Sequence, residues 1–144
     1  MTDSILEGVK AFFVDNAAAA GLETNAPVGV DFLGPDLVGY SIVTMPGATE
    51  IPWIGGGSDN TFPFAFQATL STADDTARIE NGAFFEHLKD WLKTQYEAGN
   101  LPILPTGKTA DRLAALDGGY LYQEGGSGTG IYQILCILEY TQVP

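Results

Sequence analysis

Three side chains in this sequence have the chemistry of a general acid–base site, namely Asp74, Asp75 and the single histidine, His87. Adjacent carboxylates on a strand or loop diverge, so Asp74 and Asp75 are more typical of the charged N-terminus of a helix. His87 falls near the edge of the polar arc of a predicted helix, and no Ser-His-Asp or metal-ligand spacing accompanies it. We therefore expect a histidine on the helix surface and no catalytic residues. An enzyme whose cleft combines these three side chains is kept as an alternative.

Two glycine-containing segments share part of a nucleotide-binding motif. Gly107-Lys108-Thr109 matches the end of a P-loop, but Pro102 stands where that motif needs a glycine, and Pro105 lacks an amide hydrogen. The glycine run Gly125–Gly130 has the wrong spacing for a dinucleotide fingerprint and links two predicted strands. Cys136 is the only cysteine, which excludes an internal disulfide and a thiolate cluster. We expect no cofactor and no metal.

Composition predicts one α+β domain over residues 1–144. The chain is 45% hydrophobic and 11% aromatic, which is typical of a globular protein. Six basic residues against eighteen acidic ones give a net charge of −12, which disfavours binding to nucleic acids and to acidic membranes. No apolar run approaches the roughly 20 residues that span a bilayer, and the N-terminus lacks the pattern of a signal peptide. We expect the protein to be made and folded in a cytoplasm.

The clearest predicted element is a helix over Asn81–Gly99. Asn81 is a suitable N-cap, and Gly99 stands where a left-handed C-cap is expected. A second helix is predicted over Ser4–Ala20, where Ser4 and Glu7 have the spacing of a capping box. The apolar stripe of the first of these helices consists of Phe84, Phe85, Leu88, Trp91, Leu92 and Tyr96.

Strands are indicated by apolar residues that alternate with polar or small ones. Thr109–Leu116 instead predicts a helical turn or two. The proline of the third strand, Pro63, places that strand at an edge or limits it to pairing on one side near its start. The predicted strands are Val28–Phe32 and Tyr40–Met45 as one hairpin, Phe62–Leu70, and Gly119–Gln123 and Ile131–Tyr140 as a second hairpin. The order α-β-β-β-α-β-β predicts a mostly antiparallel sheet of about five strands with two main helices packed on one face.

Two apolar surfaces find no partner within this sheet. The segment Ala48–Asn60 carries Ile51, Trp53 and Ile54 ahead of three glycines, so it either folds back as a strand or contacts a partner. The last strand is apolar on both faces. It is therefore either covered on both faces or buried on one of them by another subunit.

The order of several short segments resembles a known family, the small minor capsid or tail-completion proteins of long-tailed phages that infect Gram-positive bacteria. The resemblance extends from the first helix to the last strand. The Ala48–Ile54 segment departs from it, because it is more apolar here than the family's usual insertion. The matching residues are Val30-Asp31-Phe32-Leu33-Gly34, Tyr40-Ser41-Ile42, Met45-Pro46-Gly47, Gly57, Phe62-Pro63-Phe64, Glu80-Asn81, Phe84-Phe85-Glu86, Asp90-Trp91-Leu92, Gly99-Asn100-Leu101-Pro102, Gly107-Lys108-Thr109, Leu113, Leu116, Gly119-Tyr120-Leu121, Tyr132-Gln133-Ile134 and Cys136.

The resemblance implies a structural virion protein at the phage head–tail junction. Members of this family look like tail terminators, which assemble as a ring, usually a hexamer, to cap the completed tail tube and join it to the head. The implied partners are other copies of the chain, the tail-tube protein and the head connector. No catalytic residue carries over. As a hypothesis, an acidic ring lumen would repel the phosphates of the passing genome.

Two surfaces are therefore candidates for contact. If the chain is an assembly protein, Ile51, Trp53 and Ile54 are the candidate subunit-contact residues. If it is a small non-enzymatic binding module, then Trp53, Tyr120 and Tyr122 are expected to form an aromatic platform for a sugar or a peptide.

Overall fold

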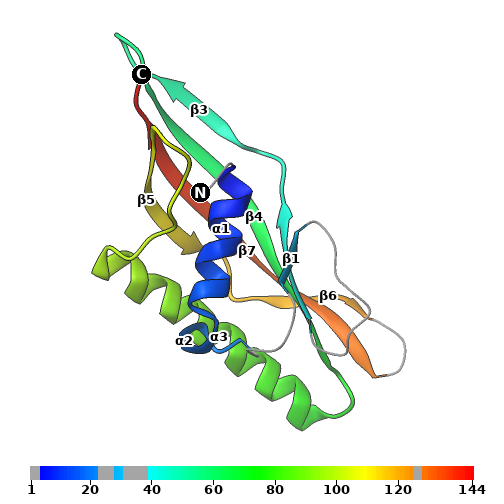
Figure 1. Ribbon diagram of the computed structural model, residues 1–144. Coiled ribbons are helices and arrows are strands. Elements are labelled where there is room, and N and C mark those ends of the chain that lie inside the picture. The colour runs from blue at the N-terminus through cyan, green and yellow to red at the C-terminus, as the bar shows by residue number, and fades with distance from the viewer. Residues whose placement is uncertain (1–3, 23–27, 31–38, 125–127) are drawn as a thin grey trace.

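The computed structural model describes residues 4–22, 28–30, 39–124 and 128–144, and it has an α+β fold (Figure 1). Within those residues, three helices accompany one mixed, mostly antiparallel sheet of seven strands, against the two main helices and about five strands expected. In chain order the elements are α1 (Ile5–Asp15), α2 (Ala17–Ala20), β1 (Val28–Val30), β2 (Gly39–Thr44), β3 (Thr49–Pro52), β4 (Ser58–Ser71), α3 (Asp75–Ala98), β5 (Lys108–Ala115), β6 (Tyr120–Glu124) and β7 (Thr129–Gln142).

The sheet is built on a long antiparallel pair of strands, β4 and β7. They pair over their full 14 residues, from Ser58 opposite Gln142 to Ser71 opposite Thr129. Each long strand has two short neighbours, one at each end: β2 and β3 flank β4, while β5 and β6 flank β7 (Figure 1). Because the short strands are divided in this way, the β3–β4 hairpin lies at one end of the β4–β7 pair and the β6–β7 hairpin lies at the other.

Pro63 lies where the two short neighbours of β4 meet. β2 pairs with β4 as far as Phe64, and β3 begins to pair at Thr61. The Pro63 carbonyl accepts a hydrogen bond from the Met45 amide at 3.2 Å, on the side of β4 away from β7. Because the N and C=O of a strand residue point to the same side, the missing proline N–H faces this junction and breaks no bond with β7. β4 is thus an inner strand that pairs on both sides at its start, with β3 and β7, and it lacks a ladder partner on one side only at Phe62 and Pro63, so neither predicted alternative describes it fully.

Helix α3 is longer than the sequence pattern predicted. It begins at Asp75, and its N-cap is Asp74, whose carboxylate accepts the Ala77 amide at 2.8 Å. The predicted cap at Asn81 is therefore wrong. Asn81 is buried within the helix, and its side-chain amide donates to the Ser71 carbonyl at 2.7 Å, which joins α3 to the end of β4. The predicted left-handed C-cap is confirmed at Gly99, where φ is +76°.

The predicted Ser4–Ala20 helix is interrupted at Asn16. The Ser4 hydroxyl accepts the Glu7 amide as expected of a cap. Asn16 leaves helical geometry at φ −113° and ψ 19°, and its side-chain amide donates to the Phe12 carbonyl at 2.8 Å. An asparagine that bonds its local backbone in this way competes with the helix, so the chain restarts as α2. α2 ends at Ala20, where the predicted helix also ends, and Gly21 follows in the left-handed region.

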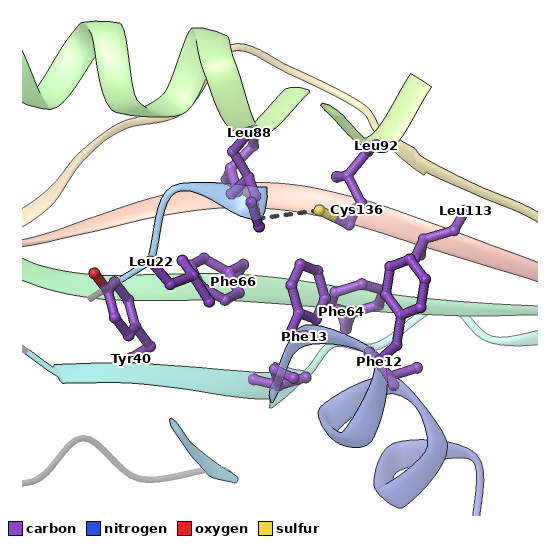
Figure 2. Close-up of a cluster of buried hydrophobic side chains, with 14 of the residues drawn as sticks. Phe12, Phe13, Leu22, Tyr40, Phe64, Phe66, Leu88, Leu92, Leu113 and Cys136 are labelled. Atoms are coloured by element: carbon purple, nitrogen blue, oxygen red, sulfur yellow. Dashed lines mark hydrogen bonds between the residues drawn. The ribbon is translucent and has the colours of Figure 1, made fainter. Parts of the chain in front are cut away.

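The core lies between one face of the sheet and the two longer helices. Phe13 of α1 contacts Phe64 and Phe66 of β4 with ring centroids 6.3 and 5.0 Å apart. On α3, Phe85 stacks on Tyr132 of β7 at 5.9 Å. Figure 2 shows Phe13, Phe64 and Phe66 in this core, with Cys136 of β7 between Leu88 and Leu92 of α3. The helical stripe is confirmed at Phe85, Leu88, Trp91 and Leu92, whereas Phe84 is half-buried and Tyr96 is 43% exposed.

Two predictions about the strands are wrong. β1 and β2 pair in parallel, not as a hairpin, with Val28 opposite Tyr40. Residues 31–38, which include the predicted strand end at Phe32, lie outside the described residues. The segment predicted to be helical is strand β5, which pairs with β7 and has a bulge between Ala110 and Arg112. Leu113 and Leu116 have helical spacing, but pairing with the edge of β7 overrides this weak local preference.

Three other predictions concern hairpins and topology. The Ala48–Asn60 segment does fold back, as β3 paired with the start of β4. β6 and β7 form the predicted antiparallel hairpin, whose tip at residues 125–127 lies outside the described part of the chain. The sheet is mostly antiparallel, as expected, since β1–β2 is the one parallel pair among the described strands. No described helix is both long enough and apolar enough to cross a membrane.

Cys136 should resist thiol reagents as long as the protein is folded. Its side chain is fully buried, and burial raises the pKa of the thiol, with a smaller contribution from the nearby Asp117 carboxylate. The reactive species is the thiolate. We expect no labelling by a thiol-specific reagent at pH 8 in native buffer and complete labelling in denaturant. Rapid labelling of the native protein would contradict this assignment.

Candidate functional site

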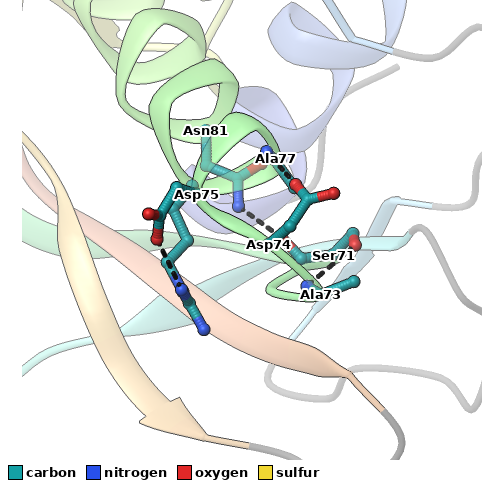
Figure 3. Close-up of polar contacts among 7 residues, drawn as sticks. Ser71, Ala73, Asp74, Asp75, Ala77 and Asn81 are labelled. Atoms are coloured by element: carbon teal, nitrogen blue, oxygen red, sulfur yellow. Dashed lines mark hydrogen bonds and ion pairs between the residues drawn. The ribbon is translucent and has the colours of Figure 1, made fainter.

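The candidate acid–base residues do not form a site. Asp74 caps α3, and the Asp75 carboxylate is paired with Arg78 at 3.0 Å on the exposed first turn (Figure 3). His87 lies thirteen residues along the helix from Asp74, a distance of about 20 Å. No group of three or more His, Cys, Asp or Glu side chains among the described residues is arranged to hold a metal ion. The predicted enzyme cleft is therefore not formed by these three residues.

His87 makes a contact that holds two helices together. It is exposed, as predicted, and its Nε2 lies 3.2 Å from the carbonyl oxygen of Ala19, in the last turn of α2. That carbonyl has no partner within its own helix, because the last carbonyls of any helix lack one. Gly21 allows this approach, since a Cβ at that position would be 3.0 Å from the imidazole Cδ2. His87 thus helps to hold α2 against α3.

The three aromatic residues of the binding-module alternative lie at opposite ends of the sheet. Trp53 follows β3, whose last residue is level with Gln142 at the end of β7. Tyr120 lies opposite Gln133, nine residues away along β7, which corresponds to about 30 Å. Tyr120 and Tyr122 are 43% and 54% exposed. A single platform made of all three rings is therefore not formed.

The β3–β4 hairpin presents the candidate contact residues. Its turn is closed by a hydrogen bond from the Trp53 amide to the Gly57 carbonyl at 2.9 Å, and Gly55, Gly56 and Gly57 all have positive φ. The Trp53 ring lies against Gly57, where a Cβ would come within 2.7 Å of the indole and 2.8 Å of the Gln142 carbonyl. Glycine at 57 is therefore what allows the indole to pack down on the hairpin.

The apolar side chains of this hairpin point into solvent. Ile51, Trp53 and Ile54 are 63%, 39% and 106% exposed. The hairpin behind them is well ordered by hydrogen bonds, because Thr61 Oγ1 accepts the Thr49 amide at 3.0 Å and also bonds the Thr49 hydroxyl at 2.6 Å. The predicted contact residues therefore sit together on a structured projection. Exposed apolar groups gathered in this way are typical of interaction surfaces.

The second face of the sheet is also available for contact. Both α1 and α3 pack on the other face, so no helix in the described part of the chain covers this one. At its centre the half-buried Val43 and Leu135 lie in register with the fully buried Ala65 between them, and the half-buried Ile137 lies beside them. Leu135 and Ile137, on this face of the last strand, are therefore half-buried and not covered by a described helix.

A hydrogen-bonded row crosses the same face. Gln67 Nε2 donates to Gln133 Oε1 at 2.8 Å, and Gln133 Nε2 donates to the Tyr120 hydroxyl at 2.8 Å. Gln133 is only 4% exposed, so this row satisfies a buried amide and ties three strands together. The row separates the apolar centre from the β6 end of the sheet.

A hollow between α3 and β5 was missed by sequence reasoning. It has a volume of about 470 Å³ and a floor formed by Leu113, Ala114 and Ala115 of β5. Lys89, Lys93 and Tyr96 line its helical wall because steps of four and three residues bring them to one side of α3. Its rim is completed by Asp90, Glu97 and Arg112. The lysine spacing is visible in the sequence, but the hollow requires β5, which was predicted to be helical.

A second hollow of about 480 Å³ adjoins the first. Tyr96 and Arg112 line both, and the second is also lined by Ile51 and Asp59 of the β3–β4 hairpin. Arg112 is held there by an ion pair with Glu139 at 2.9 Å. The hollowed flank thus runs from the middle of α3 to the base of the hairpin.

We compared the chain with known proteins. It matches no protein-family model, and no curated protein is similar to it at a significant level.

Proposed function

We propose that this chain is a structural virion protein of a long-tailed phage, without catalytic activity. In this role it acts at the head–tail junction, where copies of it assemble as a ring that caps the completed tail tube and joins it to the head. The fold is proposed to be that of a tail terminator, and the ring a hexamer. The proposal rests on the resemblance of the ordered segments listed above and on one structural observation, the exposed apolar β3–β4 hairpin.

The hairpin supports an assembly role because its exposed residues serve no purpose in the chain's own core. Ile54 is completely exposed, and Ile51 is nearly two-thirds exposed. Each isoleucine that stays in water lacks roughly 1.5–3 kcal/mol of the hydrophobic stabilisation that full burial would provide. A partner that covers them recovers this free energy. The half-buried centre of the open sheet face offers a second surface of the same kind.

The charge of the protein is compatible with DNA passage through a ring. Eighteen acidic residues against six basic ones repel phosphate and prevent the genome from adhering. For this purpose the acidic residues should line the lumen. An assembled ring with a neutral or basic lumen, and with its acidic residues on the outer rim, would contradict this part of the proposal.

Neighbouring genes and a reconstitution test the proposal together. We expect genes for a portal, a major capsid protein and a tail-tube protein beside this one, whereas a metabolic operon would contradict the proposal. When the tail-tube protein from that locus is polymerised with the purified chain, electron microscopy should show a ring at one end of each tube. Tube length should also fall as the chain is added, because capped ends stop growing.

A matched pair of variants makes the reconstitution specific. Ile54→Asp places a charge in the apolar hairpin tip, and Ile79→Asp does the same at a 72% exposed isoleucine in the first part of α3. We expect Ile54→Asp to lose capping while remaining folded, and Ile79→Asp to cap normally. Capping by both variants, or by neither, would remove the hairpin from the proposed contact.

A further inference from the structure

We propose that the β3–β4 hairpin of one copy inserts into the hollow between α3 and β5 of the next copy, so that subunits join head to tail. This inference rests on the proposed function and identifies the self-contact through which the ring would form. For brevity, the hollow lined by Lys89, Lys93, Tyr96, Arg112 and Leu113–Ala115 is called the α3–β5 groove. The occupant is specified: Ile51, Trp53 and Ile54 of a second, identical chain.

The groove has the size and chemistry to accept such a hairpin. Its volume of about 470 Å³ is in the range of binding clefts, and it can hold a few large apolar side chains. The floor is apolar, since it consists of Leu113 and two alanines, and the 43% exposed ring of Tyr96 provides one wall. An apolar floor beside an exposed aromatic ring is what a tip bearing isoleucine and tryptophan would contact.

Charge complementarity favours a second copy over an arbitrary apolar partner. The groove carries Lys89, Lys93 and Arg112, which are half of the six basic residues of the chain, together with the acidic Asp90 and Glu97 on its rim. The salt bridges among the described residues are Arg78–Asp75 and Arg112–Glu139, and neither of them includes Lys89 or Lys93. The hairpin carries Glu50 and Asp59 in the strands behind its apolar tip and no basic residue. Copies of a protein with net charge −12 repel one another, so patches of opposite charge are needed for them to associate.

The contact is of the head-to-tail kind, because hairpin and groove are different surfaces of the same chain. After the first contact forms, one copy still has a free groove and the other still has a free hairpin. Such a heterologous interface generates a closed ring when the rotation between copies divides the circle evenly. A two-fold symmetric contact would instead use both surfaces at once and stop at a dimer. The unmodified chain therefore forms higher oligomers in the first arrangement and only dimers in the second.

A mixing experiment with two defective variants tests the inference. Ile54→Asp removes the apolar tip, and Lys93→Glu reverses a charge of the groove. Both positions are exposed, so folding should be preserved. Sedimentation at high protein concentration, with carbodiimide coupling of lysines to carboxylates to trap weak contacts, should show higher oligomers for the unmodified chain. Each variant alone should lose at least tenfold in self-association. A one-to-one mixture should form dimers and nothing larger, because one intact hairpin then meets one intact groove.

Two positions outside the hairpin and the groove provide the controls. Lys10→Glu makes the same charge change on α1 and should self-associate like the unmodified chain, as should Ile79→Asp. Full oligomers from either defective variant alone, or a mixture that stays monomeric, would overturn the hairpin-in-groove contact. An unmodified chain that neither sediments as an oligomer nor couples would overturn it as well. The proposed function is decided separately by the ring at the tube end, so a ring that forms despite Lys93→Glu refutes only the inference.

Discussion

Trp91→Ala is expected to lower the free energy of unfolding by about 3–5 kcal/mol, the range for deleting a large aromatic side chain from a core. Trp91 is 8% exposed and is the point at which α3 meets α1. Its ring centroid lies 5.3 Å from that of Phe12 and 6.3 Å from that of Phe13. Domains of this size have roughly 5–15 kcal/mol of stability in all. We therefore expect a partly unfolded or aggregating protein, detectable by guanidinium denaturation followed by circular dichroism.

His87→Ala is the control on the same helix. The imidazole is exposed and makes one hydrogen-bonding contact, to the Ala19 carbonyl at the end of a four-residue helix. Exposed single hydrogen bonds contribute about 1 kcal/mol or less. We expect folding and self-association close to those of the unmodified chain. A His87→Ala protein that folds but fails to assemble would assign this residue to the interface and contradict its scaffold role.

Gly119→Ala is expected to destabilise the protein by about 2–5 kcal/mol. Gly119 has φ +80°, a conformation that costs a non-glycine residue roughly 1–2 kcal/mol. A Cβ at this position would lie 2.7 Å from Cγ of Phe85 and 2.9 Å from its Cβ, and Phe85 is 1% exposed. Forcing a methyl group against a buried ring adds about 1–3 kcal/mol of overpacking. The midpoint of guanidinium denaturation should fall accordingly.

The neighbouring glycine provides the matched control. Gly118 is exposed, and a Cβ at that position would meet nothing within 4 Å. Gly118→Ala should therefore change the free energy of unfolding by less than about 0.5 kcal/mol. Equal effects at both positions would show that the loop between β5 and β6 is strained as a whole, and that the contact with Phe85 is not the cause.

Only one of the two surfaces proposed for assembly could be predicted from the sequence. The hairpin residues Ile51, Trp53 and Ile54 were predicted from an apolar run ahead of three glycines, and the structure places them together on an exposed projection. The α3–β5 groove emerged only from the folded chain. It combines a helix wall and a strand floor that are more than ten residues apart in sequence. Their pairing is an inference that the mixing experiment decides.

Local signals in the sequence were sufficient for several features. The periodicity of α3, its Gly99 cap, the Ser4 cap of α1 and the β6–β7 hairpin all depend on residues within a few positions of one another. The alternation of apolar residues along the last strand likewise places Cys136 on the buried face of β7. The exposed position of His87 on α3 could also be anticipated, because it follows from the helical periodicity.

Tertiary structure alone decided the remaining features, because they depend on pairing between distant segments. β5 is a strand only because the edge of β7 offers its residues hydrogen bonds, and those bonds override the helical spacing of Leu113 and Leu116. β1 pairs in parallel with β2 at the edge of the sheet, and this direction depends on how the chain returns to the sheet and not on a local pattern. The separation of Trp53 from Tyr120 follows from the register of two 14-residue strands, which no local pattern encodes. The sequence by itself thus determined which residues are apolar and periodic, while the long-range strand pairing determined which of them meet and which remain exposed for a partner.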